Sequence, residues 1–315
     1  MKVARSALVV AVILVSLVAY SQTPKTGVPV SLPVSYEGHR FYVVPVTTSG
    51  VSLRFYTDSG GGLFILPEAV KNAGLKTHSE SGMEIVDFPP FQSGKSIPPA
   101  LGKSYLPVFT DKAPPHMENL SGMLGQEWFG GRTWTWGYKE GTLLWRADGD
   151  VPKNPDHTIT LGFQTDSNGK RSANVPRITI TVEGQSLDVL FDTGATTYLK
   201  PEALKNIGDG GPVQRATSFM AQETLDSWHK NHPDWKYVDD AEDPTGQPMI
   251  QAPEITVAGY KVGPVWFTRR PDGAFHKFMT QFMDKQVEGA LGGSGLQYFR
   301  ITVDYPNAVA VFERP

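Results

Sequence analysis

The sequence of 315 residues contains no cysteine, which excludes disulfide bonds and every form of thiol chemistry. It also has little excess charge, because 29 lysines and arginines nearly balance 32 acidic residues. A formal net charge of −3 favours neither nucleic acid nor an anionic membrane surface as a partner. Stability must therefore come from packing, and the 40% of hydrophobic residues is enough for a substantial core.

No apolar run is long enough for a comfortable membrane span. The one extended run, from Ala7 to Tyr20, falls short of the roughly 20 residues that a transmembrane helix needs. Two basic residues precede it, and small residues stand at the −3 and −1 positions of a cut before Gln22. This pattern predicts a signal peptide at 1–21, a secreted or periplasmic location and no membrane contact after cleavage. A retained anchor is the less favoured alternative.

Glycine and proline are plentiful, with 32 and 25 residues. Many turns between short segments rich in β-branched and aromatic residues indicate a mainly β protein.

The chain also repeats itself. In a first alignment, segment 52–74 matches segment 186–208 without a gap, and 10 of the 23 positions are identical. A second alignment, at a wider offset, pairs Gly122-Met123-Leu124-Gly125 with Gly289-Ala290-Leu291-Gly292. The sequence therefore predicts two lobes of similar construction.

The wider offset of the second alignment means that the second half carries extra residues between its two matched segments. We expect an N-terminal lobe at 22–149 and a C-terminal lobe at 150–315, with an insertion at about 209–288. Two helical stretches are predicted in the insertion, one over Phe219–Trp228 and one around Phe275–Met283. The second is expected to face the core, with a lid over substrate as the alternative.

Each half shows the same order of predicted elements. A strand ends in Asp-Ser-Gly or Asp-Thr-Gly, a short apolar strand follows, and a helix then begins with Pro-Glu-Ala. Each half closes with a β-hairpin. The strands before the aspartates are Leu53–Thr57 and Leu187–Phe191, and the closing hairpins begin with Thr133–Trp136 and Arg300–Tyr305.

The repeated aspartates, Asp58 and Asp192, are the candidate catalytic residues. Two carboxyl groups that share one site hold a proton between them, because both cannot ionise easily. Such a pair supplies a general base for a water molecule and a general acid for a carbonyl oxygen. This chemistry requires neither a metal nor another cofactor.

The segments Asp58-Ser59-Gly60 and Asp192-Thr193-Gly194 resemble the active-site motif of the pepsin and retropepsin aspartic proteases. The resemblance, closest to bacterial retropepsin-like proteins of the tandem type, implies a two-lobe acid-protease fold and a peptide or protein substrate. It implies that Ser59 and Thr193 brace the aspartates. It also implies that two apolar-glycine elements support the aspartate loops: Leu124-Gly125 and Leu291-Gly292.

With both aspartates in one chain, we expect a monomeric endopeptidase. The family's substrate-covering flap is expected within 78–115 or in the corresponding part of the second half. Three other interpretations stay open: a catalytically inactive peptide-binding protein, a metal site near His229 and His232, and, least favoured, a serine hydrolase using Ser294, whose surroundings do not fit G-x-S-x-G.

Overall fold

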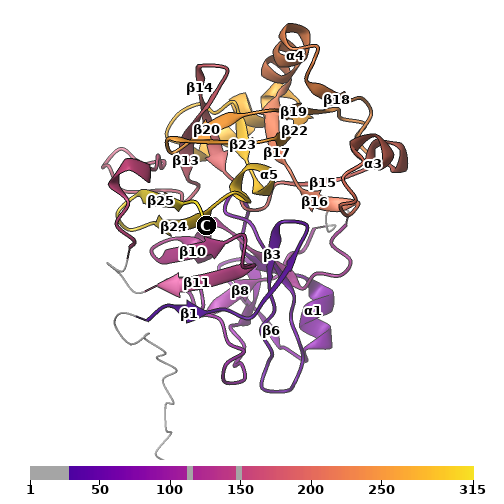
Figure 1. Ribbon diagram of the computed structural model, residues 1–315. Helices are drawn as coiled ribbons and strands as arrows, with labels where there is room; N and C mark the ends of the chain where they lie inside the picture. Colours follow the sequence, from indigo (N-terminus) through magenta and orange to yellow (C-terminus); the bar gives the residue numbers. More distant parts are fainter. Residues whose placement is uncertain (1–27, 112–115, 147–150) are drawn as a thin grey trace, which may run out of the picture.

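The computed structural model describes residues 28–111, 116–146 and 151–315. Figure 1 shows a lower half built from the N-terminal part of the chain and an upper half built from the C-terminal part. The predicted signal peptide, 1–21, lies outside the described residues, and so does the predicted lobe boundary at 149 and 150. Within the described residues, no helix has the length and apolar character to cross a membrane.

Among the described residues, the lower half contains a five-stranded sheet, a three-stranded sheet and two short helices. In the five-stranded sheet the order is β2 (Val34–Glu37), β3 (Arg40–Val43), β4 (Phe55–Thr57), β9 (Gly122–Leu124) and β5 (Phe64–Ile65). The remaining elements are β6 (Thr77–Glu80), β7 (Met83–Asp87), β8 (Tyr105–Pro107), α1 (Pro67–Asn72) and α2 (Gln126–Phe129).

The upper half is built on a nine-stranded sheet, to which the predicted insertion contributes several strands. The order is β18 (Lys236–Val238), β19 (Met249–Ala252), β22 (Val265–Arg270), β17 (Ser218–Ala221), β23 (Gly289–Leu291), β14 (Gln185–Phe191), β13 (Arg177–Val182), β20 (Ile255–Val257) and β21 (Tyr260–Val262). Outside this sheet lie the hairpin β15 (Thr196–Tyr198) and β16 (Gln214–Ala216), and the helices η1 (Pro155–His157), α3 (Pro201–Ile207), α4 (Gln222–Asn231) and α5 (Gly293–Leu296).

A six-stranded sheet joins the two halves. Its order is β1 (Val30–Ser31), β11 (Thr142–Arg146), β10 (Thr133–Gly137), β24 (Arg300–Asp304), β25 (Val309–Glu313) and β12 (Thr158–Thr160). In Figure 1 the yellow strands β24 and β25 lie beside the magenta strands β10 and β11. Because β10 pairs with β24 along its whole length, the two halves share hydrogen bonds and a core. The expected mainly β architecture with two lobes is confirmed.

The elements of the two halves recur at the offsets found in the sequence. Strands β9 and β23, helices α2 and α5, and the closing hairpins β10–β11 and β24–β25 all correspond in the second alignment. Helices α1 and α3 begin at Pro67 and Pro201, which the first alignment pairs. Proline suits the first position of each helix, where no backbone N–H is needed.

The pairing next to the central strand differs between the halves. In the lower half β5 pairs with β9, whereas its counterpart in sequence, β15, pairs with β16. Strand β17, from the predicted insertion, takes the place beside β23. Its Met220 is fully buried, so it supplies an apolar strand that the threonine-rich β15 cannot.

The two helical predictions in the insertion were only partly right. Helix α4 begins at Gln222, because the residues before it form β17. The predicted second helix is a π-turn, η2 (Ala274–Phe278), followed by a 3₁₀ turn, η3 (Met279–Phe282). Phe275 and Met283 are buried as expected, but Phe278 and Phe282 are 59% and 39% exposed. The core-facing prediction is wrong for these two residues, because the π-turn changes the rotation between successive side chains.

Candidate active site

Each candidate aspartate stands directly after a strand that runs parallel to its supporting element. Strand β4 pairs with β9, and β14 pairs with β23. The Asp58 N–H donates to the Leu124 carbonyl at 3.1 Å, and the Asp192 N–H donates to the Leu291 carbonyl at 3.0 Å. Leu124 and Leu291 are fully buried, so both loops are held by core residues.

The glycines of the motif allow the chain to turn back onto each carboxyl group. The Gly60 N–H donates to Asp58 Oδ1 at 2.9 Å, and the Gly194 N–H donates to Asp192 Oδ1 at 2.8 Å. A Cβ atom on Gly194 would lie 2.2 Å from the Asp58 carboxyl carbon. Only glycine therefore leaves room for the aspartate of the opposite half.

The supporting glycines are required by close backbone contacts. A Cβ on Gly125 would lie 2.1 Å from the Gly61 carbonyl oxygen, and one on Gly292 would lie 2.0 Å from that of Thr217. No real Cβ approaches an oxygen so closely. Gly125 thus packs directly on the backbone of the Asp58 loop, whereas Gly292 packs on Thr217 and on the Ala195 side chain of the Asp192 loop.

Ser59 and Thr193 interlock across the boundary between the halves. The Ser59 N–H donates to Thr193 Oγ1 at 3.1 Å, and the Thr193 N–H donates to Ser59 Oγ at 3.0 Å. The Ser59 hydroxyl itself donates to the Phe191 carbonyl at 2.6 Å. All these atoms are buried, so this exchange fixes the position of one aspartate loop relative to the other.

The two aspartate carboxyl groups lie close enough to influence each other's ionisation. Burial raises the pKa of Asp192 well above its usual range, and the negative charge of Asp58 raises it further. Burial also raises the pKa of Asp58, but the Gly60 N–H and the neighbouring Asp192 carboxyl group counteract this effect. The two carboxyl groups therefore share one proton between them, since both cannot ionise easily in one buried place. Asp192 is only 8% exposed, while Asp58 is partly exposed.

Two residues that the sequence analysis did not single out also contact the Asp192 loop. The Tyr56 hydroxyl, from β4, donates to the Gly194 carbonyl at 2.6 Å and also contacts Thr196 Oγ1. Thr196 Oγ1 lies 3.1 Å from the same carbonyl. In the first alignment, Tyr56 corresponds to Leu190 of the second half. This difference between the halves is the sequence signal that could have identified Tyr56.

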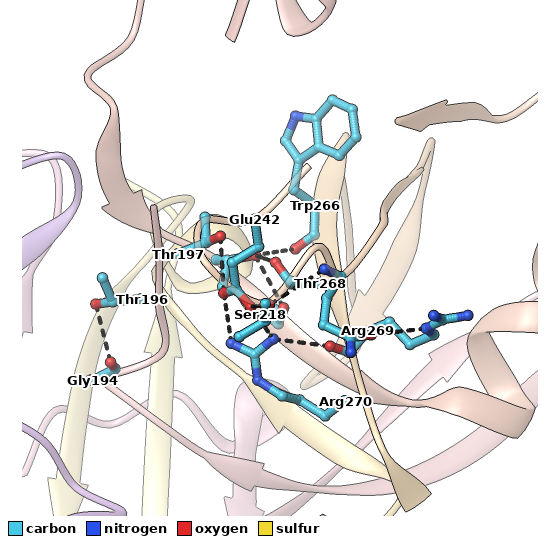
Figure 2. A network of polar contacts seen from close by, with 12 residues as sticks. Gly194, Thr196, Thr197, Ser218, Glu242, Trp266, Thr268, Arg269 and Arg270 are labelled. Atoms are coloured by element: carbon cyan, nitrogen blue, oxygen red, sulfur yellow. Dashed lines mark hydrogen bonds and ion pairs between the residues drawn. The ribbon is translucent and has the colours of Figure 1, made fainter. Parts of the chain in front are cut away.

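A buried ion pair lies behind the same loop. Figure 2 shows Glu242 between Thr197 and Arg270, with Gly194 and Thr196 to one side. Thr197 directly follows Thr196 in the chain. Glu242 is 4% exposed and forms two hydrogen bonds of 2.7 Å with the Arg270 guanidinium. It also accepts a hydrogen bond from Thr197 at 3.1 Å. This bidentate pair anchors β15 immediately after the aspartate loop.

Two hollows on the described surface lie away from the aspartates. One, of about 1120 Å³, is lined by residues that include Arg54, Pro67 and Leu120. The other, of about 580 Å³, is lined by residues that include Phe88 and Trp145. Neither has Asp58 or Asp192 in its wall.

The hairpin β6–β7 begins one residue before the range expected for a flap and otherwise lies within it. Its first strand is exposed throughout, and Ser81 and Gly82 form its turn with positive φ. Its role over the aspartates stays a prediction.

The residues of the other interpretations have structural partners. The ring of His229 stacks on Tyr237 at 3.7 Å, and that of His232 stacks on Trp235 at 4.4 Å. Over the described residues, no group of three or more His, Cys, Asp and Glu side chains is arranged to hold a metal ion. Ser294 is buried, and its hydroxyl lies 2.9 Å from that of Ser218 and 2.8 Å from the Trp266 carbonyl.

No protein-family model and no curated protein matches this sequence. Solved structures with a similar chain path include an aspartic proteinase from Irpex lacteus, with a TM-score of 0.47 and 10% identity over 91% of this chain and 97% of that one. They also include conglutin gamma, a basic 7S globulin from lupine seeds (TM-score 0.48, 11% identity, 90% and 94% covered), and basic 7S globulin from soybean (TM-score 0.47, 11% identity, 92% and 95% covered). The function proposed below rests on the geometry of the site.

Proposed function

We propose that this protein is an aspartic endopeptidase of the tandem retropepsin-like type, which hydrolyses peptide bonds with Asp58 and Asp192. The observation that carries the proposal is the pair of adjacent, interacting carboxyl groups, whose loops are held together by the Ser59–Thr193 exchange. Burying two acidic groups side by side costs more free energy than burying two neutral side chains. A purely structural role would therefore not explain why two carboxyl groups meet at this boundary.

In the proposed reaction the Asp58 carboxylate takes a proton from a water molecule placed between the aspartates. The Asp192 carboxyl donates its proton to the substrate carbonyl oxygen as the water oxygen bonds to the carbonyl carbon. The tetrahedral diol then collapses: Asp58 protonates the leaving nitrogen, the C–N bond breaks, and Asp192 recovers its proton from the diol hydroxyl. Each carboxyl group ends in the state in which it began.

The test is hydrolysis of a denatured protein and of a quenched peptide library by the purified chain, from pH 3 to pH 9. We expect internal cleavage that a statine peptide inhibits, because its hydroxyl mimics the tetrahedral intermediate. We expect a chelator to leave the rate unchanged. Inactivation by chelator with recovery on zinc would contradict the proposal and favour a site at His229 and His232.

The second candidate is a peptide-binding protein without catalysis. Neither of the two surface hollows has Asp58 or Asp192 in its wall, so a ligand bound in either of them would not lie against the aspartates. This placement favours peptide binding without catalysis. In that case statine would bind without any turnover of peptides.

We also propose that the enzyme acts as a monomer after export. Export is supported by the sequence pattern at 1–21, and the monomeric state by the presence of both aspartates in one chain. Mass spectrometry of the mature N-terminus and light scattering would test these two points.

A further inference from the structure

We propose that Tyr56 and Thr196 are positioning residues for Asp192, because they hold Gly194, whose N–H donates to the Asp192 carboxyl group. The inference deepens the proposed function, on which its catalytic part rests. It begins from a chemical difference between two halves whose loops otherwise match closely.

The difference lies at two positions of the first alignment. Tyr56 corresponds to Leu190, and Thr196 corresponds to Gly62. Leu190 and Tyr56 each reach the glycine of the opposite loop. Leu190 only packs there, since a Cβ on Gly60 would lie 2.8 Å from its Cδ2 atom. Hydroxyl groups therefore surround the Gly194 carbonyl, while an apolar side chain lies against Gly60.

The hydroxyl groups form a closed triangle with the carbonyl. Tyr56 Oη lies 2.6 Å from the Gly194 oxygen, and Thr196 Oγ1 lies 3.1 Å from it. Tyr56 Oη also contacts Thr196 Oγ1. Whichever hydroxyl donates to the other, one proton always remains for the carbonyl. Tyr56 is buried, so water does not compete for this contact.

Gly194 also supplies the N–H that donates to Asp192 Oδ1 at 2.8 Å. The two hydroxyl groups on its carbonyl hold this glycine, which has no side chain to restrict its backbone, in the conformation that makes this hydrogen bond. A donor held in place stabilises the ionised form of Asp192. Tyr56 and Thr196 thus keep Asp192, which burial makes a weak acid, acidic enough to protonate a carbonyl oxygen.

Other groups also face the aspartates, and they constrain the experiment. The charge of Asp192 acts on Tyr138, after β10, and the charge of Asp58 acts on Tyr305, after β24. The charges of Asp58 and Arg40 both act on Tyr56. Burial raises the pKa of all three tyrosines well above the usual range, so they stay neutral over the working pH range. Of these groups, only Tyr56 is changed by the variants below.

The decisive variants are Tyr56→Phe, Thr196→Val and the double variant. Tyr42→Phe is the matched control, because Tyr42 is a buried tyrosine whose ring lies 5.4 Å from that of Tyr56. We expect kcat to fall about fivefold in Tyr56→Phe, the size of effect of one hydrogen bond. The alkaline limit of the pH profile should rise by about half a unit, with the acid limit unchanged. The double variant should show a larger shift than either single variant.

A titration of ¹³C-labelled aspartate carboxyl groups by NMR gives the same answer without turnover. We expect the upper pKa of the pair to rise in Tyr56→Phe and to stay in place in Tyr42→Phe. An unchanged upper pKa in both Tyr56→Phe and the double variant would overturn the inference. An inactive wild-type protein would instead reject the proposed function, while the titration would still decide the role of Tyr56.

Discussion

Thr135 and Thr302 lie directly opposite each other where β10 pairs with β24, with their hydroxyl oxygens 2.8 Å apart. The second alignment, which relates the closing hairpins of the two halves, also pairs these two threonines. Ser59 and Thr193, paired by the first alignment, likewise contact each other reciprocally. Two residues that are exchanged by a twofold rotation can contact each other only if they lie beside the rotation axis. A local twofold axis therefore runs between the two halves and passes close to both pairs and to the aspartates.

The threonine pair on this axis should behave as a coupled unit. Thr302→Val should cost about 1 kcal/mol of unfolding free energy, and Thr135→Val about 2 kcal/mol, because the latter also removes the acceptor of the Arg146 guanidinium. Since the double variant leaves no unpaired threonine hydroxyl, its cost should be less than the sum. Urea denaturation measures all three, with Thr160→Val, at an exposed position of the same sheet, as the control. Simple additivity would show that the hydroxyl groups are not coupled.

Asp58→Asn and Asp192→Asn should each abolish turnover while the fold is kept. An amide cannot exchange the proton, so the remaining carboxyl group lacks its partner, and combining the changes should add little. The measurement is single-turnover cleavage, with circular dichroism as the check on folding. Mixing the two single variants should restore nothing, and recovered activity would place the working site between two chains.

The pH dependence of kcat/KM should be bell-shaped with an optimum on the acid side of neutrality. The two limits are macroscopic pKa values of the Asp58–Asp192 pair: both carboxyl groups are protonated below the acid limit, and both are ionised above the alkaline limit. Burial raises the pKa of both carboxyl groups. Initial rates from pH 2 to pH 9 test this. A rate that climbs steadily through pH 9 would contradict it.

Asp192→Asn should stabilise the protein near neutral pH. In the native chain, folding keeps Asp192 protonated while the unfolded chain ionises it, so the native state binds more protons and wild-type stability falls as pH rises above about 4. Asparagine does not titrate and escapes this loss. Thermal unfolding should give a higher midpoint for the variant at pH 7 and nearly equal midpoints at pH 3. A lower midpoint for the variant at pH 7 would contradict the pKa direction.

The sequence predicts the local parts of the site well. Asp-Ser-Gly and Asp-Thr-Gly lie at strand ends, and Leu124-Gly125 and Leu291-Gly292 lie beneath them, because each motif needs a particular backbone conformation. Strand pairing is less visible. Strand β17, and not β15, lies beside β23. Which of these two short segments takes this place depends on how much apolar surface each buries there, and that depends on the packing of the folded protein.

Contacts between residues that lie far apart in the sequence were the hardest to predict. Tyr56 and Gly194 lie far apart in the sequence, and no periodic pattern joins them. Likewise, an i, i+3, i+4 pattern near Phe278 predicts an α-helix but not the π-turn that exposes this side chain.

The pairing of β10 with β24 makes each half nearly complementary to a copy of itself. A fragment ending after β11 would expose the edge of β10, and a second fragment could cover it with its own β10, Thr135 facing Thr135. Such fragments should therefore associate as homodimers when produced separately. In such a homodimer the two identical loops would bring Asp58 of one fragment against Asp58 of the other. The separated lobe would then form a symmetric pair of aspartates.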